Sequence, residues 1–351
     1  MRNKGNVLLA ILLLGVFLLI GMFILGKPRG FGKLARLPGT LWESGKPRPT
    51  GETVSRGGEG PLCITGNVVE IKDAVSKNRG EIEKALDEIK KEIGFTLVTQ
   101  NFLSDSTEND WKAFLDAAQA KGIKVLATFL PASPPKWTGN GFDLGVNETF
   151  LLKMQNHPAL FGFFLIDEPF HKKHEWQITT KRMQQLYRQA KDIAPNVPMF
   201  VGFSREISKG ETDPKFSDFR FAKGMCDYCG MSALEFRNYG DGNKFYKDML
   251  LDNQTVSRMV VAREDPNAKI YSTVQVFGSV SGKSSYYMPS EEELQEMVDT
   301  LLSSQLQTEK ELDMLVWQSW RSFDVADSGQ LNLSKPQFEG HRNIAREACG
   351  T

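Results

Sequence analysis

The sequence predicts a closed (β/α)8 barrel preceded by a single transmembrane helix. Three observations lead to this prediction: an uncharged apolar segment near the start, eight apolar runs of strand length beyond it, and segments of helical period between those runs. Strands that are apolar along their whole length are typical of parallel sheets buried on both faces. A barrel of this class usually takes about 250 residues, and the chain has 351.

The first segment is long enough to cross a membrane. Residues 6–25 contain no charged side chain, and some 20 helical residues span a hydrocarbon core of about 30 Å. A cleaved signal peptide is the alternative, but its apolar part would run only about 7–15 residues before a small-residue cleavage site, which is missing here. We therefore assign residues 1–26 to an anchor and residues 27–60, rich in Gly, Pro and basic residues, to a flexible linker.

The remaining residues, 61–351, form the predicted barrel. Its eight strands are expected at Leu62–Gly66, Phe95–Gln100, Ile123–Leu130, Leu160–Ile166, Met199–Phe203, Cys226–Leu234, Ile270–Phe277 and Met314–Trp320. Apolar residues recur at helical spacing in Glu81–Ile93, Asp110–Lys121, Thr180–Ile193, Glu291–Ser304 and Pro336–Glu347. An open doubly wound sheet would normally carry a Gly-rich phosphate turn after its first strand. No such turn follows Gly66, so a closed barrel is favoured.

The four cysteines are predicted to be unpaired. Cys226 and Cys229 lie three apart within one expected strand, so their side chains should point to opposite faces, which suits neither a disulfide nor a shared metal. Cys63 and Cys349 are far apart in the sequence. Buried thiols are therefore the expectation for all four.

A carboxylate pair, Asp167-Glu168, follows directly after one of the most apolar strands. The active sites of such barrels lie at the carboxyl ends of the strands. Desolvation by the apolar strand and mutual repulsion both raise a carboxyl pKa, as a general acid working near neutrality requires. The alternative is structural, with Asp167 paired to Lys172 or Lys173. We expect the catalytic role.

The stretch FGFFLIDEP, residues 161–169, resembles the fourth-strand motif of barrel glycoside hydrolases related to clan A, in which Asn-Glu-Pro is usual. Later segments resemble bacterial glycosidase-like barrels in the same order: Gln275-Val276-Phe277-Gly278, Pro289-Ser290-Glu291-Glu292-Glu293-Leu294 and Trp317-Gln318-Ser319-Trp320-Arg321. The similarity spans roughly residues 95–323. It implies that Glu168 is the proton donor and that Asp167 lies near the sugar 2-substituent.

One position departs from the resemblance. Retaining enzymes of clan A place a nucleophilic Glu at the end of the seventh strand, where this chain has Gln275. An amide cannot form the glycosyl ester. Three alternatives follow, in order of preference: Glu235 supplies the second carboxylate, the substrate's own 2-acetamido group acts with Asp167 orienting it, or the site binds glycans without cleaving them.

Polar and aromatic side chains near the strand ends are the candidates for holding the substrate: Asn101, Tyr228, Gln275, Gln318 and Trp320. Gln318 and Trp320 share one strand face, which leaves Trp317 on the other face to pack against helices. His171 and His174 enclose two lysines and make poor metal ligands. Neither a metal nor a cofactor is expected.

The sequence therefore predicts a membrane-anchored, glycoside hydrolase-like protein that acts on polysaccharide or glycoconjugate. A catalytically inactive glycan-binding or scaffolding barrel is the alternative. Basic and acidic residues balance at 43 each, so no general attraction to nucleic acid is expected. The basic residues after the apolar segment would by themselves keep the barrel in the cytoplasm, whereas a carbohydrate substrate favours the opposite side. The oligomeric state is not fixed by the sequence.

Overall fold

The computed structural model describes residues 61–65, 79–130, 135–171, 177–203, 205, 207, 210–211, 213–231, 236–238, 243–276, 287–303, 310–318, 321–322, 331–332 and 336–351. The expected anchor and linker, residues 1–60, lie outside these ranges. In the described part of the chain, no helix is both long and apolar enough to cross a membrane.

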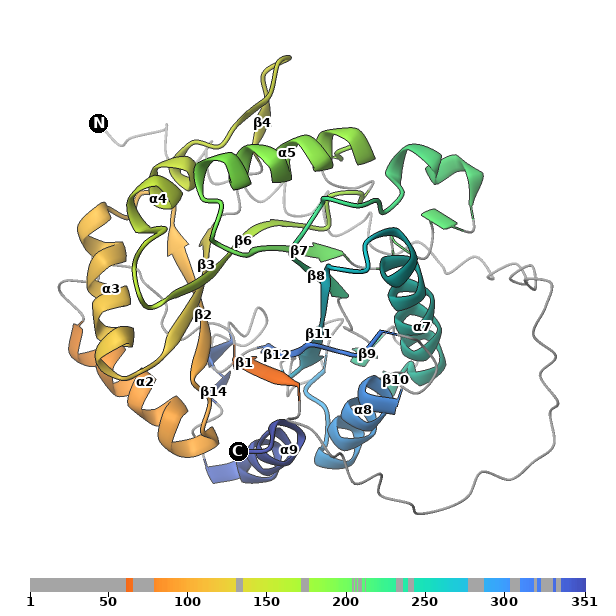
Figure 1. Ribbon diagram of the computed structural model, residues 1–351. Coiled ribbons are helices and arrows are strands. Elements are labelled where there is room, and N and C mark those ends of the chain that lie inside the picture. Colours follow the sequence, from red (N-terminus) through yellow and green to blue (C-terminus); the bar gives the residue numbers. More distant parts are fainter. Residues whose placement is uncertain are drawn as a thin grey trace, which may run out of the picture. The chain divides into compact units, whose positions relative to one another are not determined.

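Eight parallel strands close into a ring (Figure 1). In chain order they are β1 (Leu62–Thr65), β2 (Leu97–Leu103), β3 (Lys124–Leu130), β6 (Leu160–Asp167), β7 (Met199–Phe203), β8 (Tyr228–Met231), β11 (Lys269–Gln275) and β12 (Met314–Gln318). Each strand pairs with the next, and β12 pairs with β1. The prediction of a closed eight-stranded barrel is confirmed, and β6 is its fourth strand.

Helices surround the ring (Figure 1). The predicted ones are confirmed as α2 (Arg79–Ile93), α3 (Glu108–Ala120), α5 (Thr180–Ile193), α8 (Glu291–Ser303) and, after the 3-10 turn η4 (Pro336–Phe338), α9 (Glu339–Cys349). Short two-stranded pairs and a second 3-10 turn complete the described elements: β4 (Lys136–Trp137) with β5 (Phe142–Asp143), β9 (Phe236–Asn238) with β10 (Asn243–Phe245), β13 (Arg321–Ser322) with β14 (Leu331–Asn332), and η2 (Pro214–Phe219).

Two helices, α4 (Val146–Met154) and α7 (Lys247–Glu264), lie where the sequence analysis gave no helix bounds. Polar side chains weaken the apolar period of α7, because its buried residues include Gln254, Ser257 and Arg258. The Gln254 amide donates to the Met231 carbonyl (3.4 Å), and its oxygen accepts the Ser272 hydroxyl (2.7 Å). The buried side of α7 is therefore held to the barrel partly by hydrogen bonds, which hydrophobic periodicity does not detect.

Side chains alternate between two cores. Those facing the helices form the larger core, which includes Trp317 as predicted. Those inside the barrel form a second cluster that combines aliphatic and aromatic residues: Ile64, Leu97, Leu126, Phe200, Tyr228, Tyr271 and Met314, with Phe161, Phe164 and Val316 packed against it. Alternation of this kind follows from the period of two along a strand.

Three interior glycines make room for the aromatic residues. A Cβ atom at Gly162 would lie 2.7 Å from the Phe200 ring, and one at Gly230 would lie 1.9 Å from Cζ of Tyr271. At Gly202 the added atom would meet Oδ1 of Asp167 at 2.2 Å. Any other residue at these positions would displace a neighbouring ring or carboxylate.

The strand β6 contains one extra residue relative to β3 and another relative to β7. Its register with β3 passes from Leu160↔Val125 to Gly162↔Leu126, and its register with β7 passes from Phe164↔Phe200 to Ile166↔Val201. The second irregularity puts Leu165 and Ile166, consecutive residues, into the helix-side core. Bulges of this kind redirect side chains, and here Asp167 pairs with Gly202 at the end of the ladder.

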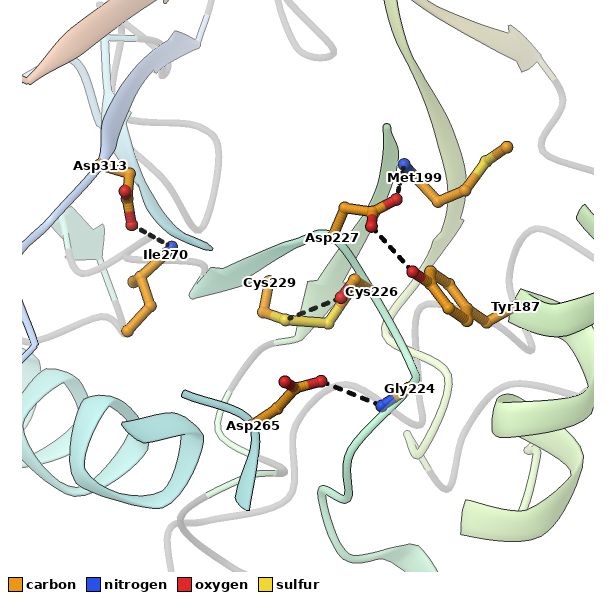
Figure 2. Close-up of a disulfide and its surroundings, with 9 residues drawn as sticks. All are labelled: Tyr187, Met199, Gly224, Cys226, Asp227, Cys229, Asp265, Ile270 and Asp313. Carbon is orange, nitrogen blue, oxygen red and sulfur yellow. Dashed lines mark hydrogen bonds between the residues drawn. A yellow bond between two sulfur atoms is a disulfide. The ribbon is translucent and has the colours of Figure 1, made fainter. Parts of the chain in front are cut away.

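The prediction of unpaired cysteines is wrong, since the structure contains two disulfides. Cys226 pairs with Cys229 across a Cα–Cα distance of 5.5 Å, which is possible because β8 begins at Tyr228 and Cys226 precedes it (Figure 2). Cys63 pairs with Cys349 across 5.9 Å. Barrel closure joins this second pair, because it brings the first strand beside the last helix.

Aspartates fix the opposite, N-terminal end of this part of the barrel (Figure 2). The carboxylates of Asp227, Asp265 and Asp313 accept the backbone N–H groups of Met199, Gly224 and Ile270 at 2.8, 3.0 and 2.7 Å. Asp227 also accepts the Tyr187 hydroxyl (2.8 Å) and the Lys191 ammonium (3.1 Å). Burial, followed by this contact with Asp227, raises the pKa of Tyr187.

The two disulfides should contribute unequally to stability. Replacing Cys63 and Cys349 by serine should lower the free energy of unfolding by about 2–5 kcal/mol, because this bond joins residues 286 positions apart. Replacing Cys226 and Cys229 should cost less, since that bond spans 3 positions. Urea titrations compare the free energies of unfolding of the two double variants with that of the wild type. If all four cysteines of the denatured, unreduced wild type reacted with an alkylating reagent, neither disulfide would be present.

Candidate active site

The carboxylate pair lies at the C-terminal end of β6. The Glu168 N–H donates to the Gly202 carbonyl (2.7 Å), which continues the ladder one residue past the strand. Glu168 then accepts the His171 N–H (3.0 Å), so that residues 168–171 form a turn. Asp167 is exposed and Glu168 is half-buried. Both carboxylates are therefore at the end of the barrel where active sites of this fold are built.

Glu168 has a strained backbone. Its φ of 44° is the single positive value among the described non-glycine residues. An L-residue pays for this left-handed conformation, and the following proline restricts its backbone further. The buried ring of Phe170, 5.6 Å from the Phe203 ring, anchors the turn to the helix-side core. Strain that the surrounding structure enforces in this way is concentrated at functional sites.

Beside Asp167 and Glu168, a row of residues paired from strand to strand, here called the register row, crosses part of the barrel wall. Asp167 pairs with Gly202, Gly202 with Gly230, and Gly230 with Tyr271, on β6, β7, β8 and β11. The carboxylate of Asp167 covers Gly202, and the phenol of Tyr271 covers Gly230. The Asp167 carboxylate and the Tyr271 phenol thus extend toward each other from the two ends of this row.

Tyr271 is the functional candidate that the sequence did not reveal. Its hydroxyl is buried and has no hydrogen-bond partner in the described part of the chain. Burial, and then the charge of Asp167, raises the pKa of this phenol well above its ordinary value. The sequence does contain glycines at 202 and 230, which leave room for these two side chains. That the two glycines are neighbours follows only from the strand register.

Gln275 is buried, and its amide is engaged by backbone groups. Its oxygen accepts the Phe236 N–H (3.2 Å), and its nitrogen donates to the carbonyls of Phe236 (3.3 Å) and Tyr287 (3.4 Å). The side chain therefore ties β9 and residue 287 to the end of β11. A contact between Gln275 and a sugar, as the sequence predicts, would require these bonds to open.

The tie continues into α8. The Tyr287 hydroxyl donates to Glu293 (2.6 Å), whose carboxylate also accepts the Ser290 N–H (2.9 Å), while the Ser290 hydroxyl accepts the Glu293 N–H (3.2 Å). The last two bonds form a capping box at the start of the helix. Two of the segments that resemble glycosidase-like barrels are thus parts of one hydrogen-bond network.

The other predicted residues are distributed between both ends of the barrel. Asn101 lies in the C-terminal half of β2 on the inward face that it shares with Leu97, and Gln318 is exposed at the end of β12. Tyr228 begins β8 at the opposite end, where its ring stacks on Phe200 (4.3 Å) and its hydroxyl accepts the Lys269 ammonium (3.1 Å). The structure therefore does not bring Tyr228 to Glu168.

Two predicted site residues, Glu235 and Trp320, lie outside the described residues. Within the described ranges, no group of three or more His, Cys, Asp or Glu side chains could hold a metal ion. The chemistry that the described site offers is that of carboxylates, a phenol and amides.

No family model and no curated protein matches the sequence. Solved structures share the fold. A candidate alpha-L-fucosidase from Bacteroides thetaiotaomicron aligns with a TM-score of 0.52 at 12% identity, over 87% of this chain and 99% of that one. An endo-alpha-mannosidase of glycoside hydrolase family 99 from the same organism gives 0.51 at 12%, over 82% and 95%. A family 39 glycoside hydrolase from Bacteroides cellulosilyticus gives 0.50 at 14%, over 83% and 64%.

The network around Gln275 predicts that Gln275→Glu is destabilising. A carboxylate cannot donate to the two carbonyls, and each one left without a donor costs about 1–3 kcal/mol. Burial should raise the folded-state pKa of the new carboxyl above its unfolded value of about 4.3. The loss should therefore be smallest below that pH and grow as the pH rises. Thermal unfolding from acid to neutral pH measures it, and a pH-independent loss would contradict the assignment.

The backbone of Glu168 predicts that Glu168→Gly raises the free energy of unfolding by about 1 kcal/mol, because relief of a positive φ exceeds the added flexibility of glycine. Glu168→Ala is the matched control: it removes the same carboxylate but keeps the strain. Urea unfolding of both variants provides the comparison. Equal stabilities would show that the backbone at Glu168 is not strained.

Proposed function

We propose that this protein is a glycosidase that hydrolyses O-glycosidic bonds in polysaccharide or glycoconjugate, with Glu168 as its general acid/base. The observation that carries the proposal is the strained, half-buried Glu168 at the end of the fourth strand of a closed barrel. Glycoside hydrolases from Bacteroides share this fold, and the FGFFLIDEP segment resembles the fourth-strand motif of such enzymes.

The neighbouring groups suit two distinct roles. Asp167, exposed beside Glu168, would orient the sugar ring, while Glu168 protonates the departing oxygen. Gln275 cannot be the nucleophile, because it is an amide and its polar atoms bond backbone groups. We therefore assign the second carboxylate to Glu235, which precedes Phe236, the residue that Gln275 holds. A carboxyl separation of about 5 Å would give retention, and one of roughly 6.5–9.5 Å inversion.

The cysteine chemistry supports a barrel that functions outside the cytoplasm, anchored through residues 1–26. All four cysteines are paired, and disulfides form and persist in oxidising compartments. Polysaccharide and glycoconjugate substrates are also found there. This support outweighs the basic residues after the apolar segment, which by themselves favour the cytoplasmic side.

Leaving-group dependence tests the role of Glu168. For substrates with poor leaving groups, such as alkyl glycosides, Glu168→Gln should lower kcat/KM by about 10²–10⁴-fold, because proton donation is lost. For dinitrophenyl glycosides, which leave without a proton, the loss should be much smaller. Asp192→Asn, an exposed carboxylate in the last turn of α5, is the control and should leave all rates unchanged.

The outcomes separate the alternatives. Equal losses across all leaving groups, or none, would contradict the acid role. Saturable binding of glycans by the wild type without any product would indicate the glycan-binding barrel instead. Turnover confined to 2-acetamido sugars and abolished by Asp167→Asn would indicate substrate assistance.

A further inference from the structure

Tyr271 suggests a specificity element inside the proposed site. We propose that the Tyr271 hydroxyl and the Asp167 carboxylate together hold one hydroxyl group of the bound carbohydrate. This inference rests on the proposed function and identifies which substrate group the inner wall of the site recognises. Tyr271 is then a specificity-determining residue, distinct from the acid Glu168.

The register row provides the geometry. Oδ1 of Asp167 lies 2.2 Å from where a Cβ atom of Gly202 would be, and the Tyr271 oxygen lies 2.2 Å from the same point on Gly230. Gly202 and Gly230 are paired neighbours, so their Cβ positions are about one strand spacing, ~5 Å, apart. The two oxygens therefore belong to the same short stretch of the inner wall. A single ligand oxygen that bonds both, at about 2.7 Å each, would require them to lie no more than about 5.4 Å apart.

The chemistry of the two groups selects an alcohol. The Tyr271 phenol stays protonated at neutral pH, because burial and the charge of Asp167 raise its pKa, and it therefore offers a proton. An ionised carboxylate can only accept. A group between them must accept from the phenol and donate to the carboxylate, which a sugar hydroxyl does. An ether oxygen, a fluorine or a hydrogen in its place cannot do both.

The burial of the phenol argues for such a partner. Its ring lies in the interior cluster of aliphatic and aromatic residues, 5.6 Å from the ring of Phe200, and a phenylalanine at 271 would fill the same volume. A buried hydroxyl without a partner is costly. The Tyr228 hydroxyl, by comparison, is bonded by Lys269 at the other end of the barrel. A ligand hydroxyl explains why the polar residue stands at 271.

Sugar binding in the presence and absence of the phenol tests the proposal. The background is Glu168→Gln, so that turnover does not interfere. The probes are glucose, mannose, galactose, fucose and N-acetylglucosamine, each with its monodeoxy derivatives, and saturation-transfer NMR gives Kd. Tyr271→Phe should weaken the sugar that binds by about 10- to 100-fold. It should also abolish the preference for that sugar over one particular deoxy derivative.

Two further measurements separate recognition from structure. Tyr228→Phe, the matched control, removes a hydroxyl from the opposite end and should leave every Kd unchanged. Tyr271→Phe should keep or raise the Tm, because it removes a buried hydroxyl that has no protein partner in the described residues. Unchanged binding in Tyr271→Phe would overturn the proposal, whether or not the Tm falls. The proposal would also be overturned if the Glu168→Gln protein bound none of the probes.

The proposed catalysis can fail separately. If Glu168→Gln does not alter turnover while Tyr271→Phe still abolishes the discrimination, the acid assignment is wrong and the hydroxyl subsite stands. If turnover depends on Glu168 but the deoxy preference is unaffected by Tyr271→Phe, the subsite is wrong and the catalytic assignment stands.

Discussion

The candidate site depends on a single glycine at the end of the β6–β7 ladder. Gly202 pairs with Asp167, accepts the N–H of Glu168 at 2.7 Å, and has no side chain to occupy the place of the Asp167 carboxylate. The extra residues in β6 bring Asp167 to this point. This pairing therefore places the Asp167 carboxylate and the backbone of Glu168, and the next pairings in the same row, Gly202 with Gly230 and Gly230 with Tyr271, bring the phenol toward them.

The sequence predicted the barrel because buried parallel strands are apolar along their whole length. It also located Asp167-Glu168, because the change from apolar to acidic residues marks the C-terminal end of the strand. It failed where the answer depends on distant pairing. The partner of Cys63 is set by barrel closure, and the proximity of Tyr271 to Asp167 requires the register of four strands. Tyr228 was chosen for its aromatic side chain, but it begins β8 and therefore lies at the N-terminal end of the barrel.

The network around Gln275 changes how the sequence resemblance is understood. Two of the resembling segments, those at 275–278 and 289–294, are linked by hydrogen bonds from Gln275 to Tyr287 and from Tyr287 to Glu293. The fold alone therefore gives a reason for these two segments to occur together. In this chain the seventh-strand position holds backbone instead of attacking a sugar. The support for catalysis comes from β6, where the exposed Asp167 and the half-buried Glu168, with its positive φ, lie at the C-terminal end of the strand.

The Cys63–Cys349 bond has a mechanical consequence. Residue 63 is the second residue of β1, and residue 349 ends the last helix. A pulling force applied through the residues before β1 would enter the protein next to this covalent link and pass directly to α9. Peeling the first strand from the ring would then require breaking a bond between sulfur atoms, so the barrel resists traction from its leading segment better than a ring held by hydrogen bonds alone.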